Sequence, residues 1–152
     1  MVALKERITN EMKAALLSGD RFVGETLRNL KAAILNEEVA SGRRAEGLGD
    51  AEVEKVIAKE VKKRFESAKI YRDNNRPELA EPEEKEAEIL RKYLPQQLDE
   101  TELRTIIEQK VAELGVSGAS AIGQVIGGVK ALVGNTADGA TIARIVKETL
   151  NK

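Results

Sequence analysis

The stretch Tyr93-Leu94-Pro95-Gln96-Gln97-Leu98-Asp99 decides how this chain is divided. Pro95 lacks a backbone N–H and disfavours helix at the residue before it, so the preceding helix is predicted to stop there. Asp99 offers an N-cap for a new helix, and Glu102 follows at the spacing of a capping box. We therefore predict a packed elbow between an N-terminal and a C-terminal region, residues 1–93 and 94–152.

The composition favours helices packed on helices. Of the 152 residues, 34% are charged and 41% are hydrophobic, whereas globular chains usually have about 25% and 45–50%. With two Phe, two Tyr and no Trp, a core must consist of Leu, Ile, Val and Ala, which suits helical packing. The formal net charge of -1 indicates no particular partner.

Several classes of site are excluded by the residue types. The chain contains no cysteine, which rules out disulfides, thiol catalysis and thiolate metal sites. It contains no histidine, the commonest general base and transition-metal ligand. No acidic residues fall at a metal-loop spacing, and no G-x-x-x-x-G-K-[ST] phosphate loop occurs. We predict no catalytic residues, no metal and no cofactor.

The chain is also expected to be a soluble, cytoplasmic protein without membrane contact. No window approaches the roughly 18 apolar residues of a membrane span. The stretch Met1-Val2-Ala3-Leu4-Lys5-Glu6 has an acidic residue early and no apolar run, which is not typical of a secretory signal.

Helical periodicity predicts an all-α fold of seven helices, about four in the N-terminal domain and three in the C-terminal module. Turn residues separate them, and Asp20, Asp50, Ser120 and Asp138 are predicted caps. The third helix is expected from Ala51 to about Asp73, and the fourth is expected to begin at Pro82. The sixth helix carries Gly123, Gly127 and Gly128, which we predict allow close packing against a neighbouring helix, because glycine there is otherwise costly.

The third helix has two chemically distinct sides. Apolar residues cluster on one side, and lysines on the other: Lys55, Lys59, Lys62, Lys63 and Lys69. From Lys55 to Arg76 there are eight basic and three acidic residues, whereas residues 78–88 hold six glutamates and one lysine. Two interpretations stay open: the two helices form a hairpin that neutralises both charges, or the basic face is left free for an anionic partner.

Glu60 and Arg64 are four residues apart near the apolar side of the third helix. We predict that they form a partly buried ion pair that holds a neighbouring helix in register, with a site lining a cleft as the alternative.

Motifs along the whole chain resemble the GatB/YqeY family. In the C-terminal region these are Tyr93-Leu94-Pro95-Gln96-Gln97-Leu98, Gly123-Gln124-Val125-Ile126 and Ala137-Asp138-Gly139, followed by Ile145-Val146-Lys147 and Leu150. In the N-terminal region Lys59-Glu60-Val61-Lys62-Lys63-Arg64, Tyr71, Arg76, Leu79-Ala80 and Glu88-Ile89-Leu90 resemble the stand-alone YqeY branch.

The resemblance implies a helical domain followed by a three-helix module similar to the tail of the B subunit of the Asp/Glu-tRNA amidotransferase. That tail contacts tRNA, while the amide-transfer chemistry lies elsewhere in the enzyme. This chain departs from the family at Gly123-Gln124 and Gly134-Asn135-Thr136, where lysine and arginine are common. The module therefore has two fewer cations for phosphate contacts than the resemblance implies.

Three functions follow as hypotheses. The first is a non-catalytic module that binds tRNA or docks on a tRNA-dependent amidotransferase. The second is an adaptor for a helical protein partner without RNA binding, and the third is the glutamine-dependent carbon–nitrogen ligase activity that the family label implies. Basic residues of both regions are the candidate RNA contacts: Lys55, Lys59, Lys62, Lys63, Lys69, Arg76, Lys130, Arg144 and Lys147.

Overall fold

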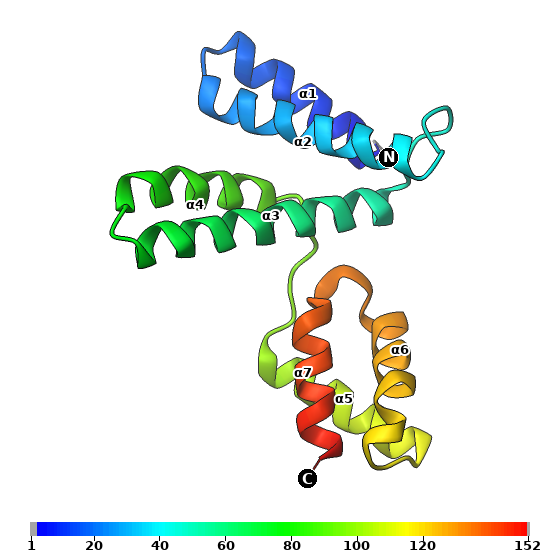
Figure 1. Ribbon diagram of the computed structural model, residues 1–152. Coiled ribbons are helices and arrows are strands. Elements are labelled where there is room, and N and C mark those ends of the chain that lie inside the picture. Colours follow the sequence, from blue (N-terminus) through cyan, green and yellow to red (C-terminus); the bar gives the residue numbers. More distant parts are fainter. Residues whose placement is uncertain (1–2, 152) are drawn as a thin grey trace. The chain divides into compact units, whose positions relative to one another are not determined.

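The computed structural model describes residues 3–151, so residues 1, 2 and 152 at the ends of the two predicted regions lie outside it. The expected all-α fold is confirmed: the described residues form seven α-helices with two short 3-10 helices and no strand (Figure 1). The α-helices are α1 (Leu4–Leu17), α2 (Arg21–Ala40), α3 (Asp50–Asp73), α4 (Pro77–Arg91), α5 (Glu100–Leu114), α6 (Ile122–Val133) and α7 (Gly139–Leu150). The 3-10 helices are Ala119–Ala121 and Gly134–Thr136.

The chain divides into two compact units, the first ending at Leu94 and the second beginning at Pro95. Each has its own core of aliphatic side chains, as expected for a chain with few aromatic residues. The break therefore lies one residue beyond the boundary that we expected after Tyr93.

In the N-terminal unit, α1 and α2 form one helical hairpin and α3 and α4 form another (Figure 1). The first turn is stabilised by Asp20, whose carboxylate accepts a hydrogen bond from the Val23 N–H at 3.3 Å. At the second turn Asn75 has a φ of 61°, in the left-handed region that asparagine tolerates better than most residues. Both hairpins contribute to one core, centred on fully buried Ile8, Leu27, Ile57 and Leu90.

Two local predictions in this unit are wrong. Helix α4 begins at Pro77, where a missing N–H costs nothing, and Pro82 lies inside it. Pro82 has no N–H to donate a hydrogen bond to the carbonyl of Glu78, but both residues are exposed, so water can replace that hydrogen bond.

Asp50 does not cap α3. Its carboxylate accepts a hydrogen bond from the Leu4 N–H at 3.0 Å and so joins the starts of α3 and α1.

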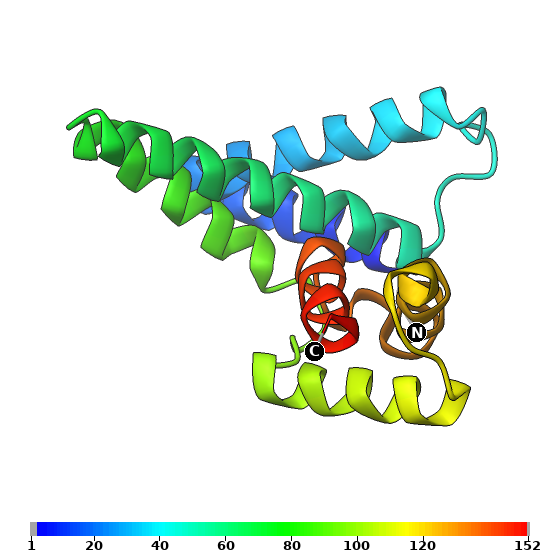
Figure 2. The same ribbon diagram turned by 60° about the horizontal axis from the view of Figure 1, so that its bottom comes forward.

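In the C-terminal unit, α6 and α7 lie side by side and α5 runs across them (Figure 2). The predicted capping box is confirmed: Asp99 accepts from the Glu102 N–H at 2.7 Å, and Glu102 accepts from the Asp99 N–H at 3.0 Å. Asp138 caps α7 by accepting from the Thr141 N–H at 3.1 Å. Ser120 does not cap α6, because it belongs to the 3-10 helix that precedes it.

The close approach predicted at Gly123 and Gly127 is wrong for the described part of this chain. Both glycines are exposed, and a Cβ built on either would meet nothing within 4 Å. At Gly128, the third glycine of this prediction, a neighbour does lie close, because a Cβ there would be 3.3 Å from Cδ of Lys110. Gly123 and Gly127 lie on the open side of α6. The buried side of this helix consists of Val125, Val129 and Val133.

The residues of the elbow are each held by their own unit. Helix α4 ends at Arg91, and Tyr93 is buried in the first core, where its hydroxyl donates a hydrogen bond to the Glu11 carboxylate. On the other side of the break, the Leu98 N–H donates to the carbonyl of Thr136 at 2.8 Å. The chain is thus anchored on both sides of Pro95.

Within residues 3–151, no single helix is both long and apolar enough to cross a membrane. The segments Glu100–Leu114 and Ala119–Thr136 reach that length and composition only when counted together, with a bend of 102° between them.

Candidate functional site

Helix α3 presents its lysines on the side opposite the core. Its inner side buries Val53, Ile57, Val61 and Ala68. The five predicted lysines on the outer side are all exposed, and we call this set the lysine face: Lys55, Lys59, Lys62, Lys63 and Lys69. The periodicity of the sequence was sufficient to assign these two sides.

The acidic helix α4 contacts the arginines of α3. Arg64 Nη1 lies 2.8 Å from Oε2 of Glu60, and its Nε lies 3.0 Å from Oε2 of Glu86 on α4. Further along, Arg72 donates to both oxygens of Glu84, at 2.5 and 2.8 Å. These hydrogen bonds lower the pKa of the Glu84 carboxyl and raise the pKa of Arg72. The predicted hairpin therefore forms, and its ion pairs between helices use arginine.

Three cations of the lysine face form no ion pair among residues 3–151, although Lys55 helps to lower the pKa of the Glu52 carboxyl: Lys55, Lys59 and Lys62. Lys63 lies 3.6 Å from Glu60, and Lys69 lies 3.1 Å from Asp73. The three unpaired lysines occur at spacings of four and three residues, so they form one stripe about 10 Å long. Hairpin formation and an open basic face, which we had considered as alternatives, occur together.

A pocket of about 330 Å³ lies beside the N-terminal half of this stripe. It is lined by Glu37, Ser41, Leu48, Glu52, Lys55, Val56 and Lys59. The Glu52 carboxylate in its wall accepts from the Gly49 N–H and is paired with Arg43, and these contacts hold the pKa of Glu52 below its ordinary value. The Ser41 hydroxyl already donates to the carbonyl of Glu37 at 2.8 Å, so Lys55 and Lys59 are the groups in this pocket that can bind an anion.

Of the remaining candidate RNA contacts, the arginines form ion pairs with glutamates, whereas the lysines form none among the described residues. Arg76 lies 2.5 Å from Glu78. Arg144 is bonded at 3.0 Å to both Glu100 and Glu148, and Arg104 pairs with the same two glutamates. This four-residue ion network joins α5 to α7 and raises the pKa of Arg144. Lys130 and Lys147 are exposed and have no ion pair in the part of the chain that the structure describes.

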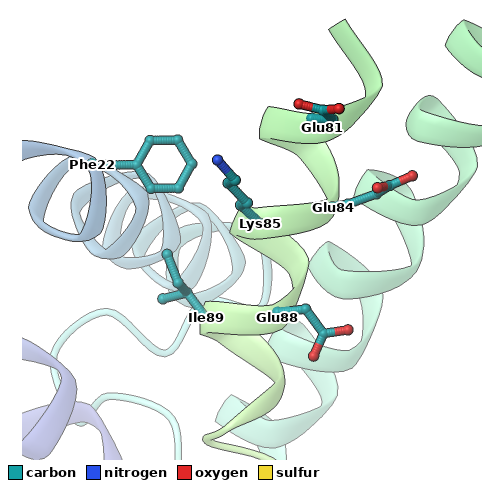
Figure 3. Close-up of a pocket in the computed structure, with 6 residues that line it drawn as sticks. All are labelled: Phe22, Glu81, Glu84, Lys85, Glu88 and Ile89. Atoms are coloured by element: carbon teal, nitrogen blue, oxygen red, sulfur yellow. The ribbon is translucent and has the colours of Figure 1, made fainter. Parts of the chain in front are cut away.

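A second depression of about 410 Å³ lies between α2 and α4 (Figure 3). Phe22 of α2 faces Lys85 and Ile89 of α4 across it, while the carboxylates of Glu84 and Glu88 point away from Phe22. Glu81 completes the lining. We call this feature the α2–α4 groove; sequence reasoning did not identify it, because its two sides lie about 60 residues apart and share no motif.

Sequence reasoning also missed a buried ion pair in the N-terminal unit. The Glu38 side chain is only 2% exposed and contacts Nζ of Lys5, which lies on the other helix of the α1–α2 hairpin. The backbone carbonyl of Glu38 also accepts from the Arg43 N–H at 2.7 Å, which fixes the start of the loop after α2. Neither residue follows a pattern that separates it from the many exposed charges of these helices.

The described residues contain no group of three or more His, Cys, Asp or Glu side chains that could hold a metal ion. The pairs of carboxylates that do occur are instead bonded to arginine, as at Arg64 and in the α5–α7 network.

The family model described as "Yqey-like protein" matches residues 5–150. Two curated relatives carry the name "Altered inheritance of mitochondria protein 41, mitochondrial". The relative from Clavispora lusitaniae is 35% identical over 92 residues, which are 60% of this chain and 52% of the relative. The relative from Lachancea thermotolerans is 29% identical over 116 residues, which are 74% of this chain and 60% of the relative. The matched part of the chain spans about half to three fifths of these relatives' lengths.

Proposed function

The chain belongs to the Yqey-like protein family, and on that premise we propose that it is a non-catalytic tRNA-associated module. In this proposal the lysine face of α3 binds the phosphate backbone of tRNA. The chain either binds tRNA by itself or docks on a tRNA-dependent amidotransferase, as the likeness of its C-terminal unit to the amidotransferase tail implies.

The observation that carries the proposal is the open stripe of Lys55, Lys59 and Lys62. Glu86 and Glu84 of α4 pair with Arg64 and Arg72, and the three lysines remain exposed at the surface. Phosphate contacts by lysine and arginine supply most of the sequence-independent affinity for nucleic acids. The pocket beside Lys55 and Lys59 gives a phosphate group space at one end of the stripe.

A filter-binding titration with bulk tRNA over a range of salt concentrations tests this proposal. The variant is the triple substitution Lys55→Gln/Lys59→Gln/Lys62→Gln. The matched control, Lys13→Gln/Lys85→Gln/Lys92→Gln, removes the same charge at exposed lysines outside the lysine face. Circular dichroism verifies that all proteins are folded.

We expect the lysine-face variant to lower the slope of log affinity against log salt by roughly 2 to 3, since each lost phosphate contact removes about 0.7 to 0.9. The control should change the slope by less than about 1. Absence of binding by the folded wild-type protein at low salt, or an equal loss in both triple variants, would contradict direct tRNA binding.

A protein adaptor is the second candidate, and the outer side of α6 favours it. Gly123 and Gly127 leave open space there. A pull-down that recovers a helical partner without RNA, and that survives nuclease treatment, would favour the adaptor over the tRNA-associated module.

The carbon–nitrogen ligase activity implied by the family label stays a separate hypothesis. Glutamine- and ATP-dependent amidation of mischarged tRNA by the purified chain alone would overturn the non-catalytic proposal. The cytoplasmic location expected from the sequence also stays a prediction, because both curated relatives are named as mitochondrial.

A further inference from the structure

The pocket beside the lysine face lies where the loop of residues 41–49 connects the end of α2 to the start of α3 (Figure 1). Its two sides carry different charged groups. Lys55 and Lys59 line the side formed by α3, and Glu37 lines the side formed by α2. A ligand in this pocket therefore meets cations on one side and a carboxylate on the other.

The pocket also has an apolar part. Leu48 of the loop and Val56 of α3 line it, and both are half-buried and pack against the core of the N-terminal unit. The volume of about 330 Å³ is at the lower end of the range of about 300 to 1,000 Å³ that is typical of small-ligand sites. Such a space suits one small amphipathic group rather than a helix of a partner protein.

The carboxylates of the pocket differ in whether a ligand can use them. Glu52 pairs with Arg43 and accepts a hydrogen bond from the Gly49 N–H at 3.1 Å, so its oxygens are occupied. Glu37 forms no ion pair or side-chain hydrogen bond among the described residues. The two lysines form no ion pair there either. The groups open to a ligand are thus two ammonium groups and one carboxylate that can accept N–H donors.

We propose that this pocket binds one unpaired nucleotide of an RNA strand whose backbone follows the lysine face, which rests on the tRNA contact proposed above. Lys55 and Lys59 belong both to the pocket and to the stripe that continues to Lys62, so a strand bound along the stripe brings a nucleotide to the pocket. The two lysines bind its phosphate, and the aliphatic wall contacts the ring of its base. Proteins read unpaired bases in this way, by apolar contact with the ring and hydrogen bonds to its edge.

The free carboxylate of Glu37 gives the pocket a preference among bases. A carboxylate only accepts hydrogen bonds, so it favours a base whose edge carries an amino group. Cytosine, adenine and guanine carry such a group, whereas uracil has a carbonyl oxygen at the position of the cytosine amine. The pocket thus adds base selectivity to phosphate contacts that carry no sequence information by themselves.

Fluorescence anisotropy with labelled oligomers of about eight units tests the pocket, since single-stranded sites cover about 4 to 16 nucleotides. The oligomers are oligo(C), oligo(U) and an abasic ribose-phosphate chain, which has the same phosphates but no bases. All three are titrated with the full chain over a range of salt concentrations, and bulk tRNA is titrated in parallel.

The wild-type protein should distinguish the three oligomers. We expect oligo(C) to bind at least about fivefold more tightly than the abasic chain, because base contacts add to the phosphate contacts. This ratio should not change with salt, since both oligomers release the same counterions. Oligo(U) should bind at least about threefold more weakly than oligo(C), because it lacks the amino group that Glu37 accepts.

The first pair of variants tests whether the base occupies the pocket. Ser41→Leu fills the pocket, and Ser41→Ala is its control, because both lose the hydroxyl that donates to the Glu37 carbonyl at 2.8 Å. Ser41→Leu should reduce the preference for oligo(C) over the abasic chain to less than about twofold, whereas Ser41→Ala should keep it.

The second pair tests the role of the carboxylate. Glu37→Gln should reduce the preference for oligo(C) over oligo(U), since an amide can also donate to a carbonyl oxygen. Glu108→Gln removes the same charge at an exposed position of the C-terminal unit and should keep the preference.

Three results would each overturn the nucleotide pocket. They are equal binding of oligo(C) and the abasic chain, equal losses in Ser41→Leu and Ser41→Ala, and tighter binding of free cytidine monophosphate than of oligo(C), which would assign the pocket to a free nucleotide. The lysine-face contact still stands in these cases if tRNA binds with the expected salt dependence. Absence of binding to tRNA and to all oligomers by folded protein would overturn both proposals.

Discussion

Arg64 on α3 lies 3.0 Å from Glu86 on α4, and the same guanidinium lies 2.8 Å from Glu60 one helical turn away on α3. The Arg64 side chain is only 12% exposed, so one cation neutralises two half-buried carboxylates from both helices of the hairpin. This contact joins α3 to α4. It also removes Glu86 from the set of carboxylates that could reach the lysine face.

The first prediction concerns this ion pair. Arg64→Ala should lower the free energy of unfolding by about 2 kcal/mol, because it leaves two partly buried carboxylates without their cation. Lys62→Ala, on the exposed side of the same helix, should change it by less than about 0.5 kcal/mol. Urea unfolding and thermal melting measure both effects. Equal melting temperatures for the two variants would show that Arg64 has no structural role.

The second prediction concerns the buried carboxylate of Glu38. Lys5→Ala should destabilise the N-terminal unit by about 2 kcal/mol, because the Glu38 side chain stays buried and loses its charged partner. Lys13→Ala is the control on the same helix, since Lys13 is exposed and unpaired among residues 3–151. If the double variant Lys5→Ala/Glu38→Gln is no more stable than Lys5→Ala, the loss does not arise from the uncompensated charge.

The third prediction concerns the elbow at high pH. Burial raises the pKa of the Tyr93 phenol, and its hydrogen bond to Glu11 raises it further. Stability contributed by this group is fully present below pH 10, the ordinary pKa of tyrosine, and falls above it, because the unfolded chain then loses a proton that the folded chain keeps.

The ionisation of the Tyr93 phenol can be measured directly by ultraviolet difference absorbance. The measurement uses the Tyr71→Phe variant, because Tyr93 is then the remaining tyrosine. We expect phenolate to form only well above pH 10, or together with unfolding. In the Tyr93→Phe variant, the free energy of unfolding should fall less above pH 10 than in the wild-type protein. Ionisation of Tyr93 near pH 10 in protein that is still folded would contradict the buried hydrogen bond.

The fourth prediction uses the neighbouring glycines of α6. Gly127→Ala should raise the free energy of unfolding by about 0.5 to 1 kcal/mol, because alanine is the better helix former and its methyl group meets open space. Gly128→Ala should gain less, because its Cβ would lie 3.3 Å from Cδ of Lys110. A destabilised Gly127→Ala variant of the isolated chain would show that the open side of α6 is covered in solution.

Local patterns were sufficient for most of the fold. Apolar periodicity located the helices, and the cap signals at Asp20, Asp99 and Asp138 each form the expected hydrogen bond. Local patterns failed where one residue type serves two roles. Proline is typical of a helix start and aspartate of a cap, but Pro82 lies inside α4, and Asp50 accepts from Leu4, 46 residues away.

The candidate sites were less predictable than the fold. Periodicity identified the lysine face, but it did not separate Lys55, Lys59 and Lys62 from Lys63, Lys69 and Arg144, which pair with carboxylates. Ion pairing depends on side-chain positions in three dimensions, and for Arg144 the partner Glu100 is 44 residues away. The α2–α4 groove had no sequence signal at all.

By itself, the sequence determined the all-helical class, the turns and the break near Pro95, because these follow from interactions within a few residues along the chain. Only the tertiary structure decided which charges remain available. It placed Arg64 and Arg72 against the glutamates of α4, left Lys55, Lys59 and Lys62 exposed, and set Phe22 opposite Ile89. The physical reason is that neutralisation and burial depend on distances through space, and the packing of the two hairpins sets those distances.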